Sequence, residues 1–376
     1  MILQIEAIDT LFFRDAKPFE MGDENWANGI FPPLPSAFYG AIRTAYFSQN
    51  PQKLQDWNDE KIEDPTRNLK IKGIYLYKEK VFTPIVSEFV SEDEEKIFFE
   101  RNSLLPNEEV FSSAKTAINP YSKEVEGVQG FLSIDRFSAL NDFINDVQSE
   151  PKSFVKAESI LTKEPKIGIA RQNSTRTTEE GKLYRVNLNR LEIAGDPNKK
   201  MSFLVDVNIE ILGEQFKLDF LKLGGENKLA ECKPANTSIS IRFPKPPLVN
   251  HFKIALLSPA IFTKTEEGRK EGGWLPDCFV YDETQKAYIG TWQGVHLKLL
   301  CAFVGSSVPV GGFDVKEKQP KMMYRAVPAG SVYHFEILDK TDNNSIYEKF
   351  GNPENPLSDI LSEQGFGLSI AGFLNN

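Results

Sequence analysis

The chain contains 376 residues, of which 40% are hydrophobic and 26% are charged, and its formal net charge at pH 7 is −9. This length exceeds that of one ordinary domain, so we expect two domains, each with a substantial hydrophobic core. The acidic balance argues against a protein that binds nucleic acid by itself through a broad basic surface. Any nucleic acid would instead lie in a local basic groove and be held together with partner subunits.

Neither the cysteines nor the N-terminus indicates secretion or a metal site. Cys232, Cys278 and Cys301 form no CxxC pair, so we expect no zinc site and no disulfide framework, and the sparse count fits a reducing cytoplasm. Residues 1–9 lack the basic start and apolar core of a signal peptide. No stretch reaches the roughly 18 apolar residues of a membrane span. We therefore expect a cytoplasmic protein with no membrane partner.

The first 50 residues predict a strand, a loop and a helix. Residues 2–8 alternate between apolar and polar, as a strand does, and residues 11–35 are rich in proline and glycine. A helix is expected to begin at Ser36, whose hydroxyl would cap it. Arg43 falls on the face of this helix opposite to the apolar residues. A helix N-terminus with a hydroxyl and nearby arginines can bind phosphate, so Ser36 and Arg43 are candidate phosphate ligands.

Two further cations, Arg14 and Lys17, lie in the loop that follows the first strand. Loops that leave the end of a strand are common places for ligand contacts, so both residues are candidates for binding a ligand. The structural alternative is an ion pair between Arg14 and its neighbour Asp15.

The remaining elements predict an α+β fold with a boundary near residues 233–249, where prolines interrupt the regular pattern. Helices are expected over residues 131–150 and from Pro356 to Gly365. The expected strands cover residues 70–90, 203–212, 251–257, 288–304 and 331–338. We therefore divide the chain into domains 1–240 and 241–376.

A long hairpin is predicted between residues 167 and 190. Two strand-like segments flank a tip, residues 172–181, that is too polar to belong to a core. Arg171, Arg176 and Arg185 lie along this hairpin. Arginine planes can stack on splayed RNA bases and attract phosphates, so these three residues are candidates for RNA binding; the alternative is a solvated hairpin.

The chain ends in a glycine-rich segment that contains Gly365, Gly367 and Gly372. Glycine lets the backbone approach a ribose–phosphate closely and can expose N–H groups to it. The structural alternative is a helix C-cap at Gly365 followed by bulges in an edge strand.

Motifs for catalysis and cofactors are missing from the sequence. Gly224 and Gly225 lie outside any GxGxxG or GxxxxGK[ST] pattern, so we expect no cofactor. His251, His296 and His334 are scattered through strand-like segments and none is flanked by glycines. Acidic residues show no metal-ligand spacing, so we predict no metal site.

Several segments, taken in order, resemble the third subunit of the Cmr complex, the type III-B CRISPR effector, which belongs to the RAMP superfamily. The matching segments are LFFRDAKPF (11–19), FPPLPSAFYGAIRT (31–44), IGIARQNSTRTTEEGKLY (167–184), LGGE (223–226), LSPAIF (257–262), GWLP (273–276), AVPAGSVY (326–333) and the closing glycines. They span nearly the whole chain, and their order makes the set more specific than any single member.

The resemblance implies two ferredoxin-like (RRM-like) domains, each with a glycine-rich loop. It makes Gly365, Gly367 and Gly372 candidates for an RNA-facing loop, and Arg14 and Lys17 candidates for RNA binding. It implies binding of the 5′ tag of the CRISPR RNA (crRNA) and docking on the large polymerase-palm-type subunit beside the backbone RAMP subunits. Catalysis would then belong to other subunits, so the resemblance implies no catalytic residue and no small-molecule substrate in this chain. Two alternatives stay open: a RAMP-type endoribonuclease that processes repeat RNA, and the equivalent subunit of the type III-A complex.

Overall fold

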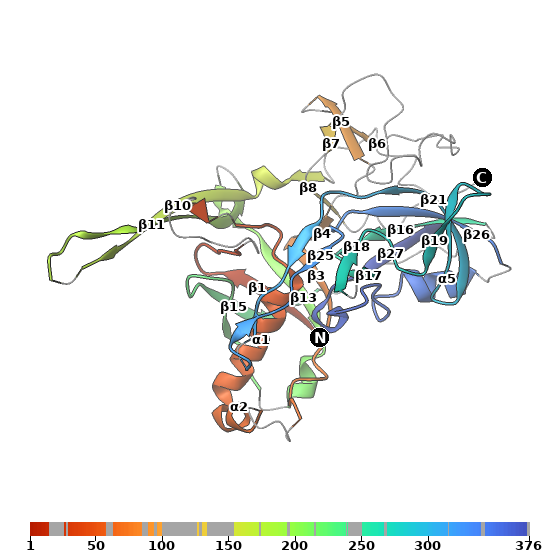
Figure 1. Cartoon of the computed structure of the whole chain (residues 1–376). Coiled ribbons are helices and arrows are strands. Elements are labelled where there is room, and N and C mark those ends of the chain that lie inside the picture. Colours follow the sequence, from red (N-terminus) through yellow and green to blue (C-terminus); the bar gives the residue numbers. More distant parts are fainter. Residues whose placement is uncertain are drawn as a thin grey trace.

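A computed structural model describes residues 1–14, 26–27, 29–57, 63–84, 89–93, 96–99, 126–127, 130–133, 154–172, 174–193, 196–213, 216–237, 239, 250–266, 269–314, 316–339 and 343–373. In this part of the chain strands far outnumber helices, and two large sheets dominate the fold (Figure 1). The predicted α+β class is therefore confirmed at this level.

The first sheet has eight strands in the order β14-β15-β1-β13-β3-β4-β8-β9, and each neighbouring pair is antiparallel. Alternate residues of β1 are buried, as expected for a strand that turns one face to the core and leaves the other face less buried. Its strands are β1 (Ile2–Ala7), β3 (Ile71–Lys78), β4 (Lys80–Pro84), β8 (Gly130–Ser133), β9 (Phe154–Lys156), β13 (Ser202–Val207), β14 (Phe220–Lys222) and β15 (Leu229–Pro234).

Helix α1 (Pro35–Gln49) covers one face of this sheet, and the short α2 (Pro51–Trp57) follows it. The rings of Phe38 and Phe203 meet edge to face at 5.0 Å in the main core. The predicted cap is wrong: Leu34 holds the N-cap position, no side chain caps the helix, and Pro35 begins it. Proline suits that position because its missing N–H would have no helical partner there.

The second sheet has six strands in the order β19-β20-β21-β26-β16-β27. Helix α5 (Asn343–Phe350) packs on it through Phe350, whose ring lies 5.5 Å from that of Phe252. The strands are β16 (His251–Leu256), β19 (Phe279–Asp282), β20 (Ala287–Trp292), β21 (Val295–Phe303), β26 (Val332–Ile337) and β27 (Ser369–Phe373). The aromatic residues of these strands build a separate core.

Both sheets contain the same arrangement of four strands. In the first, β15-β1-β13-β3 places the strands in the chain order fourth, first, third and second, with α1 between the first and second. In the second, β27-β16-β26-β21 repeats that order, with α5 between the third and fourth. Among the described residues, each four-strand unit therefore has α-helical structure in only one of the two connections that carry helices in a complete β-α-β-β-α-β unit.

The two halves pack against each other through an apolar seam. Tyr75 and Leu204 of the first sheet share a cluster with Leu257 and Leu368 of the second half. At its rim the ammonium of Lys72 forms an ion pair with the Glu354 carboxylate, with Nζ and Oε1 2.5 Å apart. One sheet thus has a helix on one face and the other half of the chain on the opposite face.

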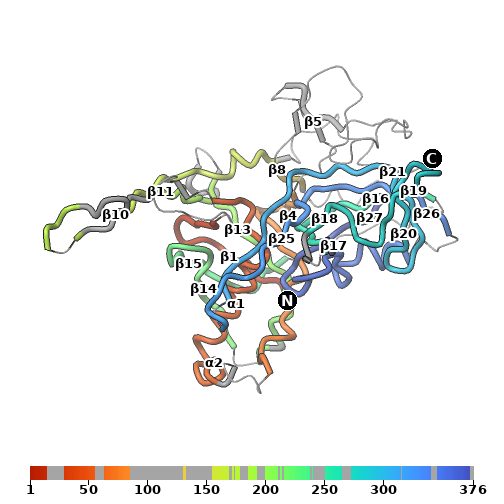
Figure 2. Tube along the Cα trace, in the orientation of Figure 1, coloured from red at the N-terminus to blue at the C-terminus, as the bar shows by residue number. Residues whose placement is uncertain are grey.

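Two hairpins lie outside the two large sheets, and the longer one extends away from this body (Figure 2). The long one joins β10 (Leu161–Arg171) to β11 (Thr178–Ile193), and it is longer than predicted. β2 (Trp26–Ala27) and β12 (Asp196–Lys200) pair with β11. We call the second the arm: residues 308–326, with β22 (Val308–Val310) paired to β25 (Tyr324–Ala326) and β23 (Phe313–Asp314) to β24 (Gln319–Pro320).

The remaining strands form two small sheets, β5 (Phe89–Asp93), β6 (Lys96–Phe99) and β7 (Glu126–Gly127) in one, and β17 (Phe262–Glu266) with β18 (Arg269–Gly273) in the other. Single turns of 3₁₀-helix occur as η3 (Ala157–Ser159), η4 (Ile209–Leu212) and η5 (Ser362–Gln364).

Both predicted helices outside α1 need correction. Residues 130–133 form strand β8, and residues 134–150 lie outside the described part of the chain. Residues 356–361 form no helix, and only the 3₁₀ turn η5 precedes Gly365. The actual helix, α5, lies just before this segment and begins in a polar run, Asn343–Asn344–Ser345, that the prediction passed over because its apolar residues are few.

Candidate nucleic-acid interface

Three of the recognised segments meet at the base of the long hairpin. Leu11 and Asn189 exchange both backbone hydrogen bonds, each 2.7 Å from N to O. The N–H of Gly225 donates to the carbonyl of Phe12 over 2.7 Å, and Phe12 packs with Val186 and Leu188 of β11. LFFRD, the hairpin and LGGE are thus adjacent in space although far apart in sequence.

The structure brings Arg14 and Arg185 into this neighbourhood. Arg14, whose side chain is exposed, forms an isolated bridge with Gly29. The position of a Cβ on Gly29 would lie 3.5 Å from the carbonyl of Asn187 on β11, and Trp26 of β2 pairs in register with Arg185. Arg14 therefore lies beside the strand that contains Arg185, whereas Lys17 lies outside the described residues.

Arg171 and Arg176 lie together at the far end of the hairpin. Arg176 has a positive φ of 58°, and its N–H donates to the carbonyl of Gln172 over 2.9 Å to close the turn. Its side chain is exposed. Arg171 is the last residue of β10 and pairs with Thr178. Figure 1 shows this tip extending away from both sheets.

Other charges at the hairpin base neutralise one another. Arg190 forms ion pairs with Glu164 and, at 2.9 Å, with Asp9. Lys228 approaches the same Asp9 carboxylate at 3.4 Å. Desolvation raises the pKa of Asp9, but the hydrogen bonds from Lys228 and Arg190 outweigh it, so the pKa is lowered overall. The hydrogen bond to Glu164 is the main cause that raises the pKa of Arg190. This network fixes the hairpin to the end of β1.

Ser36 and Arg43 do not form one site. Seven residues separate them, which is about 10 Å along a helix. The Arg43 guanidinium donates to Asp64 Oδ2 over 2.6 Å and to Thr66 Oγ1 over 2.7 Å, and it lies 5.6 Å from the centre of the Tyr39 ring. The structure thus gives Arg43 a role in holding residues 64–66 on α1; RNA contact by Ser36 or Arg43 stays a prediction.

The three closing glycines are buried in the second half. A Cβ on Gly365, which has a φ of +97°, would lie 2.9 Å from Ile71 Cγ2 of the first sheet. A Cβ on Gly367 would lie 2.1 Å from the Ser358 nitrogen, and the Gly367 N–H donates to the carbonyl of Pro259 over 2.8 Å. Gly372 pairs with Lys253 in the sheet. Close packing accounts for Gly365 and Gly367, and RNA contact by the three glycines stays a prediction.

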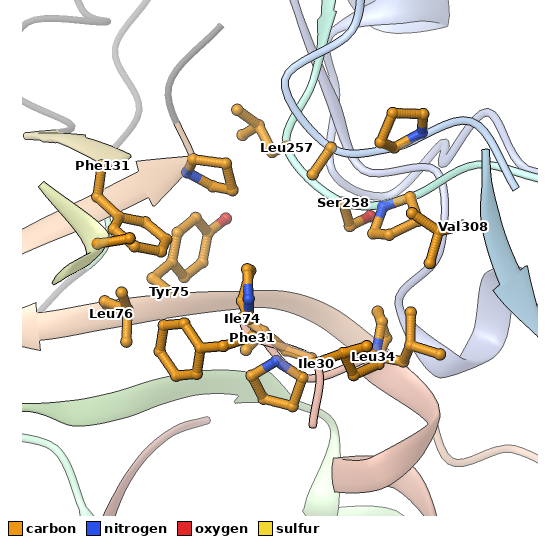
Figure 3. A pocket seen from close by; sticks show the side chains of 18 of the residues that line it. Ile30, Phe31, Leu34, Ile74, Tyr75, Leu76, Phe131, Leu257, Ser258 and Val308 are labelled. Atoms are coloured by element: carbon orange, nitrogen blue, oxygen red, sulfur yellow. The ribbon is translucent and has the colours of Figure 1, made fainter. Parts of the chain in front are cut away.

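A pocket of about 670 Å³ lies at the seam between the halves (Figure 3). Its lining is mainly apolar and comes from the segments FPPLP (31–35), LSP (257–259) and Pro328–Ala329, together with β3 and β8. Tyr75 lines it, and burial raises the pKa of its hydroxyl. Ser258 also lines it, with its Oγ accepting a hydrogen bond from the Leu368 N–H. A second group of recognised segments therefore meets here.

The arm was not recognised in the sequence, although the run from Lys316 to Arg325 (KEKQPKMMYR) contains four cations and one glutamate. That run has neither the apolar alternation of a strand nor a motif, so only its positive charge could have drawn attention to it.

Two kinds of feature are absent from the described residues. No group of three or more His, Cys, Asp or Glu side chains among them is arranged to hold a metal ion. In the same part of the chain, no helix is both long enough and apolar enough to cross a membrane.

The chain was compared with known families and structures. The model of the CRISPR-associated protein family Cas_Cmr3 matches residues 3–374. A chain from a cryo-EM structure of the type III-B Cmr-β complex, bound to cognate target RNA and AMPPnP, is similar to it. The TM-score is 0.51 and the identity 15%, over 93% of this chain and 92% of that one.

A second similar chain comes from a cryo-EM structure of type III-B Cmr-β bound to cognate target RNA, with a TM-score of 0.50 and 15% identity over 89% of this chain and 86% of that chain. No curated protein matches. At 15% identity the structural similarity is evidence for the fold alone. The family model, in contrast, matches almost every residue of the chain. The chain belongs to the Cas_Cmr3 family of CRISPR-associated proteins.

Proposed function

We propose that this chain is a non-catalytic, RNA-binding subunit of a cytoplasmic type III-B Cmr effector complex, and that it binds the 5′ tag of the crRNA. It docks on the large polymerase-palm-type subunit and lies beside the backbone RAMP subunits. Family membership and the two similar chains, which come from Cmr-β complexes bound to target RNA, support this proposal.

The observation that carries the proposal is the meeting of LFFRD, LGGE and the long hairpin. It supports a path for RNA that runs from Arg14 and Arg185 at the hairpin base to Arg171 and Arg176 at the tip. The base is held rigidly by the Leu11–Asn189 bonds and the Asp9–Arg190 pair. Cations on a fixed strand and an exposed tip suit a flexible single strand, because phosphates attract guanidinium groups and unstacked bases can lie on them.

We also propose that the two halves, residues 1–240 and 241–376, are ferredoxin-like RAMP domains. The repeated strand order, with β1 and β16 each second from an equivalent edge of the four-strand unit, supports this proposal. Each domain would have lost one of the two helices of the parent unit, the second in the first half and the first in the second half.

The alternative is an endoribonuclease that cleaves repeat RNA, for which a histidine would serve as general base. His251, His296 and His334 lie on three different strands, β16, β21 and β26. His296 faces Asp339 at 3.7 Å, and the His334 ring packs against Phe303. These contacts give no reason to prefer the alternative. Cleavage of repeat RNA by the isolated chain, abolished by one His→Ala change, would establish it.

The experiment that tests the proposal is purification of the affinity-tagged chain from its native host, followed by sequencing of the RNA that accompanies it. We expect short RNAs that share one fixed 5′ sequence, together with several other protein subunits. Partner proteins without RNA would contradict the proposal and favour a purely structural adaptor. If the tagged chain co-purified with the subunits of a type III-A complex, the chain would be reassigned to that system.

A further inference from the structure

The arm, residues 308–326, combines positive charge with exposed apolar side chains, and the RNA path proposed above does not include it. Its exposed cations are Lys318, Lys321 and Arg325, and among the described residues none of the three forms an ion pair. Phe313, Met322 and Met323 expose 57%, 60% and 50% of their surfaces. The positive charge of the arm contrasts with the net charge of the whole chain, which is −9.

The base of the arm is fixed to both halves. Val310 and Ala326 are 1% exposed and share a cluster with Ile261 and Phe366 of the second half. Leu34, which precedes α1 in the first half, packs against the same cluster. A rigid base means that the side chains further along the arm are presented at a defined place.

The outer part of the arm is a tight hairpin that reaches α1 (Figure 1). Phe313 lies opposite Pro320, and the N–H of Lys321 donates to the carbonyl of Gly312 over 2.9 Å. Asp314 accepts hydrogen bonds from the N–H groups of Lys316 and Glu317, at 3.0 and 3.1 Å. The bond from Glu317 is the largest cause that lowers the pKa of Asp314, and Lys321 and the Arg43 guanidinium of α1 add to it. Its carboxylate is therefore occupied in shaping the turn.

An exposed aromatic ring between lysines is a recognition surface for single-stranded nucleic acid. A base can stack on the ring, and the ammonium groups neutralise the phosphates on either side of it. The four cations of the arm, with Lys316 included, outnumber its two acids, Asp314 and Glu317. A folded acidic protein would match the charge but would not require an isolated, exposed phenyl ring at the hairpin.

We infer that the arm is a second contact for single-stranded RNA, with Phe313 as the stacking platform and Lys318 and Lys321 as phosphate ligands. This inference rests on the proposed function, because it assumes that RNA passes along the chain. The inference predicts single-stranded RNA beside α1. This RNA is either a continuation of the RNA at the long hairpin or a second RNA strand next to it.

The test uses the assembled complex purified without its RNA and a short fluorescein-labelled single-stranded RNA that begins with the recovered 5′ sequence. Affinity is measured at several salt concentrations for the wild type, Phe313→Ala and the double variant Lys318→Glu/Lys321→Glu. The double variant Lys78→Glu/Lys80→Glu is the matched control, because it reverses two lysines of the β3–β4 turn and changes the net charge equally.

We expect the arm double variant to bind about tenfold more weakly, with a salt slope smaller by about 1.4, as for two lost phosphate contacts to a single strand. Phe313→Ala should weaken binding by about tenfold with an unchanged slope, because it removes stacking and no charge. The control should bind like the wild type.

Unchanged affinity and slope in both arm variants, with a wild type that binds the RNA, would overturn the arm inference and leave the proposed function standing. Loss of another subunit from the arm variants, with RNA affinity retained, would overturn it in favour of a protein contact. A wild-type complex that does not bind the RNA would overturn the proposed function and the inference together.

Discussion

Gly225 donates its backbone N–H to the carbonyl oxygen of Phe12 over 2.7 Å, and this bond joins the turn after β14 to the segment after β1. The neighbouring Gly224 makes the approach possible. It has a φ of +78°, and a Cβ there would lie 2.3 Å from the same carbonyl oxygen. The glycine pair therefore serves the packing of the hairpin base.

Gly224→Ala should lower the free energy of unfolding by about 1–3 kcal/mol from backbone strain alone, with the clash adding to it. Thermal unfolding followed by circular dichroism measures the change. Gly40→Ala is the control, because Gly40 lies within α1 and no atom comes within 4 Å of its Cβ position. That change should stabilise the chain by about 1 kcal/mol. Equal midpoints for Gly224→Ala and the wild type would contradict the described contact.

Gly367→Ala separates the packing role of the closing segment from an RNA-binding role. Its Cβ would lie 2.1 Å from the Ser358 nitrogen at a φ of +78°, so we expect a large fall in the unfolding midpoint. Gly213→Ala is the matched control, since Gly213 has a φ of +98° but no atom of the described residues, apart from its two chain neighbours, lies within 4 Å of its Cβ position. This variant should be destabilised by backbone strain alone. An unchanged midpoint with lost RNA affinity would assign Gly367 to RNA binding instead.

Arg43 and Asp64 form a partly buried pair, with 22% and 27% of their side-chain surfaces exposed. Arg43→Ala should cost about 1–3 kcal/mol of stability, because Asp64 Oδ2 and Thr66 Oγ1 lose the guanidinium that donates to them. A double-mutant cycle with Asp64→Asn measures the coupling, which we expect to be about 1 kcal/mol. If the two single changes were additive and Arg43→Ala only weakened RNA binding, Arg43 would be an RNA ligand and not a structural residue.

Asp9 links stability to acid pH. Its pKa is lowered below the ordinary value of 3.8 in the folded chain, so its ion pairs contribute stability above that value. The contribution is lost as the pH falls through the lower, folded pKa. Asp9→Asn should therefore lower the unfolding midpoint at pH 7 and flatten its decline below about pH 4. Parallel melting curves for variant and wild type between pH 3 and 7 would show that the Asp9 network adds nothing.

Patterns of local residues predicted most of the sheets, and close packing accounts for what they missed. Residues 2–8 and 331–338 alternate clearly, and each corresponds to a strand, β1 and β26. Helix α5 was missed because Asn343, Asn344 and Ser345 hide a short apolar face, formed by Ile346 and Phe350, that only burial reveals. Pro356 suggested a helix start, but the chain there turns to pack on Gly367.

The sequence identified the segments that form the candidate site but not their arrangement in space. Residue types indicated Arg14, Arg176 and Arg185, yet nothing in the sequence showed that Gly29 would bring Arg14 to β11. Likewise, Arg43 has the spacing of a surface residue, and its pairing with Asp64 depends on how residues 63–66 fold back on α1. Contacts between distant segments decide which cations remain available to RNA.

The central claim is that this chain itself contacts the 5′ tag, and photo-crosslinking tests it most directly. A 4-thiouridine placed at successive tag positions would be irradiated in the assembled complex, and the modified peptides identified by mass spectrometry. We predict crosslinks to peptides that contain Arg14 or the hairpin residues from Arg171 to Arg185. Crosslinks that fall only on other subunits, at every tag position, would contradict the account.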